Sequence, residues 1–287
     1  MAARRFALVT GATRGIGRHT ALALAEAGLD VAITGRTVQE GDGRVAARVA
    51  GDGDDVEVPG SLETTAREVE EHGQRCLPLV MDLRSAESVR ATAAEVLDTW
   101  GAPAVLVNNG IVHEPQRNVL DHDAALLEAT WTGNFLHQFL LTQALVPAML
   151  EAGGGLVVDV ASSSATHDPP GPPGEGGWGL AYAASKAAFG RIAGALNAEY
   201  AGRGLQAYNV DPGFVVTESG AARGGNDALN DAGFPSADPG AVGAVVVWLL
   251  GAGEEDRQEF LGRTIWAPAL QDRLRGTPAR PAARPTA

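Results

Sequence analysis

Short apolar runs alternate with longer segments of helical character along most of the chain. The runs have the length of buried strands, and the segments between them have the length and periodicity of helices. The apolar runs cover residues 6–10, 30–34, 77–81, 104–107, 155–160, 205–210 and 263–267. One helical pattern ends near residue 27, and another begins at residue 61. Further helical patterns cover residues 86–100, 123–149, 182–200 and 240–250. This alternation predicts an α/β fold with one parallel, doubly wound sheet of about seven strands and helices on both faces.

Three segments depart from the alternation. Residues 38–60 are acidic and rich in glycine, which predicts a surface insertion or a mobile loop. Residues 218–240 are polar and glycine-rich, and we expect a flap beside the substrate site. Repeated Pro and Ala predict a disordered tail over 276–287, so a single domain is expected over 1–275.

Composition narrows the classes of partner. The chain has 287 residues, of which 45% are hydrophobic, and its 22 basic and 35 acidic side chains give a net charge of −13. An acidic chain of this kind argues against nucleic acid or an anionic membrane as the main partner. The single cysteine, Cys76, excludes an internal disulfide, and no metal site is expected. No run of 18 or more apolar residues is present, so we expect a cytoplasmic protein without a membrane span or signal peptide.

A glycine-rich turn follows the first predicted strand. Gly11, Gly15 and Gly17 are spaced G-x-x-x-G-x-G, where the commoner dinucleotide-binding spacing is G-x-G-x-x-G. Glycines allow the backbone to approach a pyrophosphate, and the helix that follows offers unpaired N–H groups and the positive end of its dipole. A plain turn is the alternative, and the position after an N-terminal strand favours the dinucleotide site.

The second predicted strand leads into Gly35 and Arg36 without an acidic residue. An acid at this place binds the ribose hydroxyls of NAD, whereas an arginine accommodates the 2′-phosphate of NADP. Arg14 in the glycine turn would add a second positive charge. The sequence therefore predicts NADP(H) over NAD, the alternative being that Arg36 simply faces solvent.

Tyr182 and Lys186 form the most suggestive pair, because Lys186 is the only lysine in the chain. Residues four apart on a helix lie one turn apart on the same face. A nearby ammonium favours the phenolate and lowers the pKa of a tyrosine, which then becomes a usable proton donor and acceptor. A chance spacing with a solvated lysine is the alternative. Asn134, inside the predicted helix 123–149, either disturbs that helix to hold a water or faces solvent.

Polar or glycine residues follow several predicted strands where each strand ends. Asn109 and Gly110 follow the fourth strand, Ser162 the fifth, and Pro212 with Gly213 the sixth. Ligands of doubly wound sheets bind beyond the carboxyl ends of the strands. We therefore expect these residues to meet the glycine turn at one site.

Taken together, these motifs resemble the short-chain dehydrogenase/reductase family, a Rossmann-type fold. The resemblance covers residues 6–217 and rests on T-G-x-x-x-G-x-G from Thr10, an altered N-N-x-G, Y-x-x-x-K and P-G-x-x-x-T. It implies that the catalytic residues are Ser162, Tyr182, Lys186 and Asn134. Tyr182 would be the general acid/base, and Ser162 would hydrogen-bond the substrate oxygen. Asn134 would hold a water that is linked to Lys186. It implies that Asp82 contacts the adenine and Thr217 the carboxamide end of the cofactor.

The resemblance and the strand ends together define a cofactor site. Its expected residues are Gly11, Thr13, Arg14, Gly15, Ile16, Gly17, Arg36, Asp82, Leu83, Asn109, Gly110, Tyr182, Lys186, Pro212, Gly213, Val215 and Thr217. Three features depart from the family. Gly110-Ile111 replaces the usual Ala-Gly, a longer proline-rich stretch separates Ser162 from Tyr182, and the last strand lacks the usual Asp-Gly-Gly ending. Ser163 and Ser164 remain alternatives to Ser162.

The leading hypothesis is reversible hydride transfer between NADP(H) and a ketone or secondary alcohol. A nucleotide-sensing regulator without catalysis and a nucleotide-sugar epimerase or dehydratase are the alternatives. The substrate is expected to be a small-molecule ketone or alcohol, specifically an apolar ketone of moderate size. Candidate pocket residues are His113, Trp131, His167, Trp178, Phe214 and Phe234. Small residues along 182–195 let another helix approach closely, which together with the resemblance predicts a homodimer or homotetramer.

Overall fold

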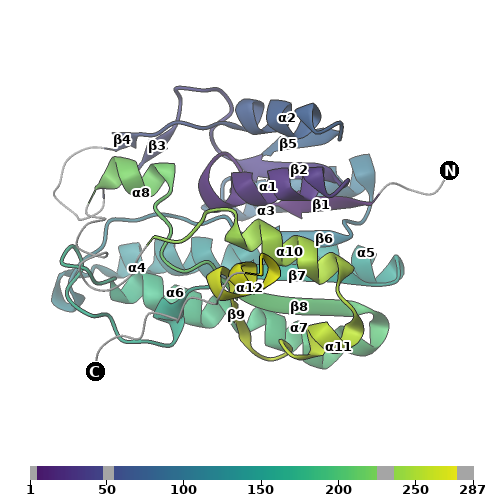
Figure 1. The fold of residues 1–287 in the computed structure, drawn as a ribbon. Helices are drawn as coiled ribbons and strands as arrows, with labels where there is room; N and C mark the ends of the chain where they lie inside the picture. Colours follow the sequence, from purple (N-terminus) through teal and green to yellow (C-terminus); the bar gives the residue numbers. More distant parts are fainter. Residues whose placement is uncertain (1–4, 48–54, 225–235, 277–287) are drawn as a thin grey trace.

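The computed structural model describes residues 5–47, 55–224 and 236–276. Within them one parallel sheet has seven strands in the order β5-β2-β1-β6-β7-β8-β9 (Figure 1). The strands are β1 (Phe6–Val9), β2 (Asp30–Gly35), β5 (Cys76–Val80), β6 (Val105–Asn108), β7 (Gly155–Val160), β8 (Leu205–Asp211) and β9 (Thr264–Trp266). The predicted doubly wound sheet is confirmed, and each predicted strand falls on an observed one.

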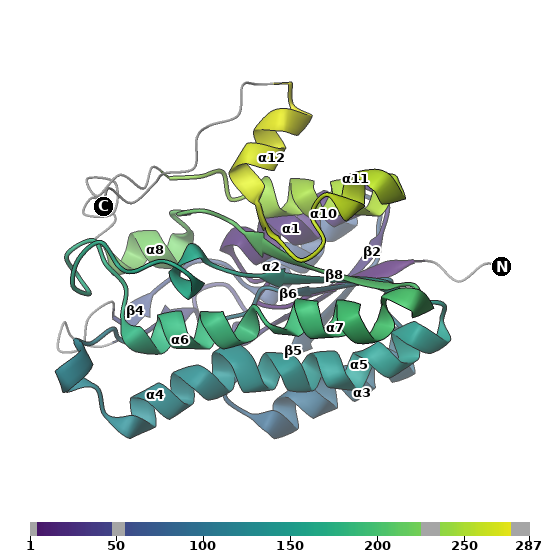
Figure 2. The same ribbon diagram turned by 90° about the horizontal axis from the view of Figure 1, so that it is seen from below.

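Helices cover both faces of the sheet, as Figure 2 shows in side view. One face carries α1 (Gly15–Glu26), α2 (Leu62–Glu71), α10 (Ala241–Gly251) and α12 (Ala267–Leu274), with α11 (Glu254–Gln258) near them. The other carries α3 (Ala86–Trp100), α4 (Ala124–Trp131), α5 (His137–Glu151), α6 (Leu180–Phe189) and α7 (Ile192–Tyr200). Helices α11 and α12 were not predicted from the sequence.

Two hydrophobic cores lie on opposite faces of the sheet. In β1, Ala7 and Val9 pack into the core under α1 and α10, whereas Phe6 and Leu8 pack into the core under α3 and α5. Successive strand residues point to opposite faces, so a strand covered on both sides must be apolar throughout. This explains why β1 and its neighbours appear in the sequence as continuous apolar runs.

The 38–60 segment, expected to be a surface insertion or a mobile loop, contains two short strands. Strands β3 (Arg44–Val45) and β4 (Val56–Glu57) pair antiparallel, while residues 48–54 lie outside the described residues. Val45 and Val58 are buried, at 5% and 0% exposure. Two apolar side chains thus anchor the described parts of an otherwise acidic segment.

Two further helical predictions change in detail. The predicted helix 182–200 is divided into α6 and α7, since the Asn209 side-chain amide on β8 donates to the Gly190 carbonyl at 2.8 Å, where α6 ends. The predicted flap 218–240 begins as helix α8 (Glu218–Arg223), whose first turn is capped by the Thr217 hydroxyl. The rest of the flap over 225–235, and the tail predicted to be disordered beyond 276, lie outside the described residues.

Across the described ranges, none of the helices combines the length and the apolar character that crossing a bilayer requires.

Candidate active site

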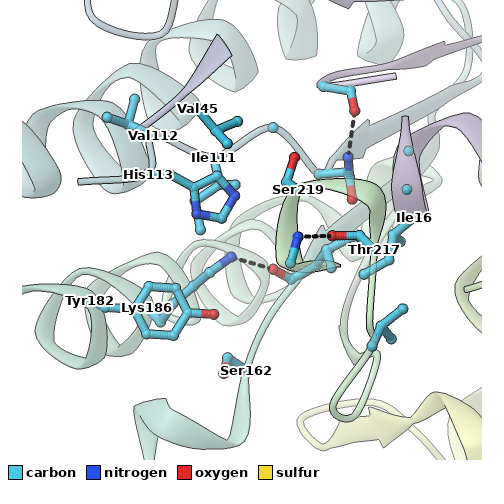
Figure 3. Close-up of a pocket in the computed structure, with 18 of the residues that line it drawn as sticks. Ile16, Val45, Ile111, Val112, His113, Ser162, Tyr182, Lys186, Thr217 and Ser219 are labelled. Atoms are coloured by element: carbon cyan, nitrogen blue, oxygen red, sulfur yellow. Dashed lines mark hydrogen bonds between the residues drawn. The ribbon is translucent and has the colours of Figure 1, made fainter. Parts of the chain in front are cut away.

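A cleft of about 420 Å³ opens at the carboxyl ends of the parallel strands (Figure 3). Loops following β1, β2, β5, β6, β7 and β8 form its walls. Every residue expected to bind cofactor lines this cleft, as do Ser162, Tyr182 and Lys186. Asn134 lies behind the wall, not on it. The topology therefore brings together residues as far apart in the chain as Gly11 and Thr217.

The glycine turn has the backbone shape that a bound diphosphate requires. Gly11 and Gly15 have φ angles of +64° and +54°, a region that disfavours other residues. A Cβ on Gly15 would lie 2.9 Å from Thr217 Cγ2. Arg14 precedes α1 without a side-chain cap, so the first N–H groups of this helix are left for other acceptors. The turn thus fits the phosphates of a dinucleotide.

The ends of β1 and β6 hold the glycine turn in place. The buried Thr10 hydroxyl accepts hydrogen bonds from the backbone N–H groups of Asn109 at 2.9 Å and Gly110 at 2.8 Å. In return, the Asn109 side-chain amide donates to the Thr10 carbonyl at 2.8 Å and the Gly11 carbonyl at 3.2 Å. This reciprocal bonding survives the unusual Gly110-Ile111 sequence, which therefore leaves the strand-end scaffold intact.

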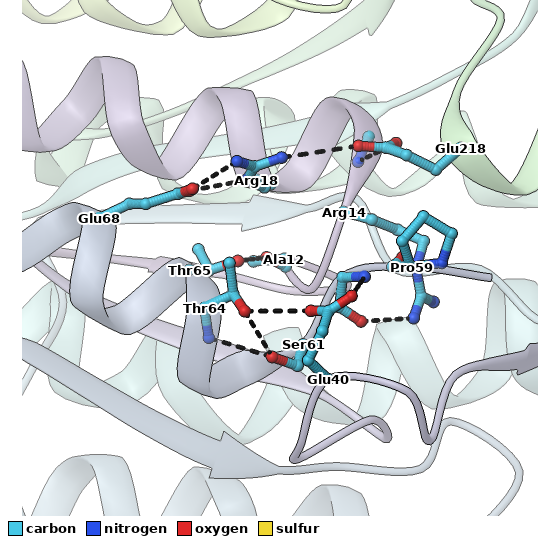
Figure 4. Close-up of polar contacts among 12 residues, drawn as sticks. Ala12, Arg14, Arg18, Glu40, Pro59, Ser61, Thr64, Thr65, Glu68 and Glu218 are labelled. Carbon is cyan, nitrogen blue, oxygen red and sulfur yellow. Dashed lines mark hydrogen bonds and ion pairs between the residues drawn. The ribbon is translucent and has the colours of Figure 1, made fainter.

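The two arginines expected at the cofactor phosphate behave differently. Arg36 is exposed at the end of β2 and lines the cleft. Arg14 also lines the cleft, but its guanidinium donates to the carbonyls of Pro59 and Gly60, each at 2.7 Å, and to the Thr37 hydroxyl at 3.1 Å (Figure 4). Arg14 therefore fastens the 38–60 segment to the cleft wall, and Arg36 is the arginine whose side chain faces solvent.

Tyr182 lies in the first turn of α6 with its hydroxyl among serines. The side chains of Ser162 and Ser164 adjoin the phenol, and the Ser164 hydroxyl donates to Ser162 Oγ at 2.9 Å. Burial raises the pKa of Tyr182, an effect that the neighbouring hydroxyls of Ser162 and Ser164 partly offset and that the nearby Asp211 carboxylate reinforces. The phenol is therefore protonated at neutral pH.

Lys186 is buried, at 5% exposure, and its ammonium donates to the Val160 carbonyl at 2.7 Å. Burial lowers the pKa of Lys186 to about 8, against the opposing influence of Asp159 and Asp211. The expectation that Lys186 lowers the pKa of Tyr182 is not met in this structure, because the ammonium is bound to a backbone oxygen and burial of the phenol dominates. The alternative of a solvated surface lysine is also wrong.

Asn134 occupies a π-helical turn (Thr132–Leu136) between α4 and α5. Its side-chain oxygen accepts from the Val112 N–H at 2.7 Å, and its amide donates to the Ser185 hydroxyl at 3.4 Å. The predicted disturbance of the helix is confirmed, since π-turns are local widenings of the α-helix that often mark functional sites. The solvent-facing alternative is excluded by an exposure of 2%.

Arg223 lines the cleft although no sequence signal pointed to it. Arg223 on α8 donates to His113 Nδ1 at 3.1 Å and to the Ala47 carbonyl at 3.1 Å. Burial, reinforced by the charge of Arg223, lowers the pKa of His113 to about 3, so this imidazole is neutral. Neither contact follows from spacing along the chain.

Of the six candidate pocket residues, His113, Trp178 and Phe214 line the cleft. Trp131 and His167 lie outside it, with 42% of Trp131 exposed on α4. Phe234 falls outside the described residues. Three of the six candidates therefore line the cleft in the part of the chain that the structure describes.

Comparison with known proteins identifies the family. The model for short chain dehydrogenases matches residues 5–58 and 43–227, which cover more than half of the chain. The chain belongs to the short-chain dehydrogenase/reductase family, whose members are oxidoreductases that use nicotinamide cofactors.

Individual relatives are about 30% identical to this chain over the aligned residues. A short chain dehydrogenase of Pseudocercospora fijiensis is 29% identical over 233 residues, 79% of this chain and 63% of that protein. D-threitol dehydrogenase of Mycolicibacterium smegmatis is 31% identical over 225 residues, 75% of this chain and 72% of that protein. The chain covers less than two thirds of the length of the fungal short chain dehydrogenases that it matches.

Solved structures share the fold. A short chain dehydrogenase from Mycobacterium paratuberculosis bound to NAD has a TM-score of 0.71 and 26% identity, with 91% of this chain and 95% of that chain covered. A metagenomic short-chain oxidoreductase in complex with NADP has a TM-score of 0.66 and 24% identity, with 87% and 91% covered. The second likeness shows the fold alone.

Proposed function

We propose that the chain is an NADP(H)-dependent oxidoreductase that transfers a hydride between the nicotinamide and a ketone or secondary alcohol. The observation that carries this proposal is the Tyr182 phenol beside Ser162 in a cleft that also holds the buried Lys186. The nicotinamide supplies or accepts the hydride. The protein's own contribution is to position the substrate oxygen and to move one proton.

Tyr182 would act as general acid in the direction of reduction. Its raised pKa keeps the phenol protonated at neutral pH, ready to donate to the substrate oxygen as negative charge develops there. The Ser162 hydroxyl would donate a second hydrogen bond to that oxygen. Asn134 would hold a water beyond Lys186 and so replace the proton from solvent.

The dinucleotide would lie along the glycine turn and the strand ends. The residues that would hold it are Gly11, Thr13, Gly15, Ile16, Gly17, Arg36, Asp82, Leu83, Asn109, Gly110, Tyr182, Lys186, Pro212, Gly213, Val215 and Thr217, with Arg14 supporting the wall. Solved relatives of this fold bind NAD in one case and NADP in another, so the fold does not decide the choice. Arg36, with no acid beside it at the end of β2, favours NADP.

The cofactor preference is tested by measuring dissociation constants for NADPH and NADH. The wild-type protein should bind NADPH more tightly, and Arg36→Asp should reverse the preference because a carboxylate repels the 2′-phosphate and accepts the ribose hydroxyls. Tighter binding of NADH by the wild type, or an unchanged preference in the variant, would show that Arg36 does not select the cofactor.

The proton-transfer role is tested with Tyr182→Phe, using a panel of ketones and alcohols with NADPH oxidation followed by absorbance. Turnover should fall by about a thousandfold or more, while the dissociation constant for NADPH stays within about threefold of wild type. Tyr200→Phe, the same change at the end of α7, is the matched control and should keep full activity. Near-normal kcat in Tyr182→Phe would refute the acid/base assignment.

The same measurements separate the alternatives. A regulator that senses nucleotide would bind NADPH yet turn over no member of the panel. An epimerase or dehydratase would keep its dinucleotide through dialysis, whereas the proposed oxidoreductase should release it.

We also propose that two copies of the chain associate through α4, α5 and α6. Apolar side chains are exposed along these helices, and one of them, Leu180, begins α6. The others are Leu127, Trp131, Leu136 and Phe139. Gly194 on α7 leaves open space for an approaching helix. Analytical ultracentrifugation should find a dimer or tetramer, and Trp131→Arg should weaken it. A monomer at micromolar concentration would contradict this proposal.

A further inference from the structure

One acidic side chain is bound to the glycine turn itself. The Glu218 carboxylate accepts a hydrogen bond from the Gly15 backbone N–H at 2.9 Å, and its second oxygen lies 3.7 Å from the Arg18 guanidinium (Figure 4). Gly15 is the first residue of α1 and Glu218 the first residue of α8. A carboxylate that lies 203 residues further along the chain is therefore placed at the N-terminus of the helix expected to bind the cofactor phosphates.

The neighbours of Glu218 place this carboxylate beside the cofactor path. Thr217 and Ser219 both line the cleft, and a Cβ on Gly15 would meet the Thr217 methyl group. At its other end, α8 is tied to the opposite wall through Arg223, which donates to His113 and Ala47. The α8 segment thus spans the cleft next to the glycine turn.

A carboxylate and a pyrophosphate bind to the same groups at the N-terminus of α1. Both are stabilised by the unpaired N–H groups of the first turn and by the positive end of the helix dipole. Two anions close together at one such site repel each other. The cofactor must therefore either displace Glu218 from Gly15 or bind against its charge.

We propose that Glu218 is an internal competitor for the pyrophosphate subsite and sets the affinity of the chain for dinucleotides. This inference rests on the proposed function, because it assigns a role within the same cofactor site. When the pyrophosphate takes the Gly15 N–H, the Glu218 side chain moves away and keeps Arg18 as its partner. The cost of that exchange weakens binding of every ligand that carries a pyrophosphate.

The experiment measures dissociation constants by isothermal titration calorimetry for wild type, Glu218→Gln and Glu218→Ala. The ligands are NADPH, ADP-ribose, which keeps the pyrophosphate, and 2′-AMP, which lacks it. Glu68→Gln is the matched control, because Glu68 is the other carboxylate paired with Arg18 but makes no contact with the glycine turn. Circular dichroism confirms that each variant is folded, and Glu218→Gln, which keeps the side-chain shape, guards against a folding defect in the alanine variant.

Glu218→Ala should bind NADPH and ADP-ribose about tenfold more tightly than wild type, since a hydrogen bond to a charged group changes an equilibrium constant by roughly this factor or more. Glu218→Gln should show a smaller gain of about threefold, because its carbonyl still accepts from Gly15 without the charge. Affinity for 2′-AMP, and the affinities of Glu68→Gln, should stay within about twofold of wild type.

Other results would overturn the proposal. Unchanged or weaker binding of NADPH by both Glu218 variants would mean that Glu218 anchors α8 and does not compete with the cofactor. An equal gain for 2′-AMP would mean a general charge effect. Failure of the wild type to bind any dinucleotide would instead refute the proposed function.

Discussion

Replacing Thr10 with valine tests how the strand ends hold the cofactor turn. The two side chains have nearly the same shape, but valine cannot accept a hydrogen bond. The hydroxyl of Thr10, a residue with 0% exposure, accepts from the N–H groups of Asn109 and Gly110. Asn109 N–H also lies 3.1 Å from the Val107 carbonyl, so it keeps a second acceptor. Thr10→Val therefore leaves chiefly the buried Gly110 N–H without a partner.

An unsatisfied buried N–H costs about 1–3 kcal/mol, and the weakened bond at Asn109 adds to it. We expect Thr10→Val to lower the free energy of unfolding by about 2–3 kcal/mol, a large part of the stability of a typical domain. The glycine turn should also loosen, so that the dissociation constant for NADPH rises by about tenfold.

Thr20 provides a matched control on α1, because it too has 0% exposure. Among the described residues, nothing forms a hydrogen bond with the Thr20 hydroxyl. Thr20→Val should therefore leave stability unchanged or raise it by about 1 kcal/mol, since it removes a buried polar atom without a partner. The same chemical change should therefore lower stability at Thr10 and should not lower it at Thr20.

Urea-induced unfolding followed by circular dichroism, at one fixed protein concentration, measures both effects. The reasoning is refuted if Thr10→Val stays within about 0.5 kcal/mol of wild type, or if Thr20→Val loses as much stability as Thr10→Val. A changed m-value in either variant would show an altered unfolded state and would have to be separated from the loss of the hydrogen bond.

Four further variants test three other contacts. Burial raises the pKa of the Asp159 carboxyl to about 7, so the native protein keeps a proton that the unfolded chain releases near pH 4, and native stability falls as pH rises through this window. In Asp159→Asn the amide oxygen can still accept from Asn108. The free energy of unfolding of this variant should not fall with pH, so it should rise relative to that of wild type by roughly 2–4 kcal/mol between about pH 4.5 and 7.5. Urea unfolding at the two pH values would show this difference. Equal pH dependence in both proteins would contradict it. Asn134→Ala should cost about 1–3 kcal/mol in thermal unfolding by leaving the buried Val112 N–H unpaired, and a loss below about 0.5 kcal/mol would contradict this. Ser61→Ala should cost about 1 kcal/mol by removing the N-cap of α2, whereas Ser61→Asp should retain most of that stability in the same assay.

The strands and the glycine turn could be predicted because their signals are local. A strand buried on both faces needs an uninterrupted apolar run, and the turn after β1 needs glycine where φ is positive. The unfavourable asparagine in a helix interior likewise indicated the disturbance that the structure shows at Asn134. The Ser61 cap is another local signal, since the Ser61 hydroxyl accepts from the backbone N–H of Thr64 within the same turn.

The partners of the charged groups could not be predicted in the same way. Spacing placed Lys186 one turn from Tyr182, but the ammonium binds the Val160 carbonyl, 26 residues earlier. The division of α6 from α7 depends on an amide from β8. Both hydrogen bonds depend on which strands become neighbours in the sheet. The order of the strands is not encoded by any pattern within a single segment.

The sequence by itself determined the parallel sheet, the glycine turn and the set of residues at the strand ends, because backbone conformation and burial follow from residue types over a few positions. Only the tertiary structure decided the electrostatics of the cleft. Burial sets the pKa values of Tyr182 and Lys186, and chain packing brings Glu218 to Gly15 across 203 residues. Charges act through space and through the surrounding medium, so their effect is fixed only when the fold has placed every neighbour.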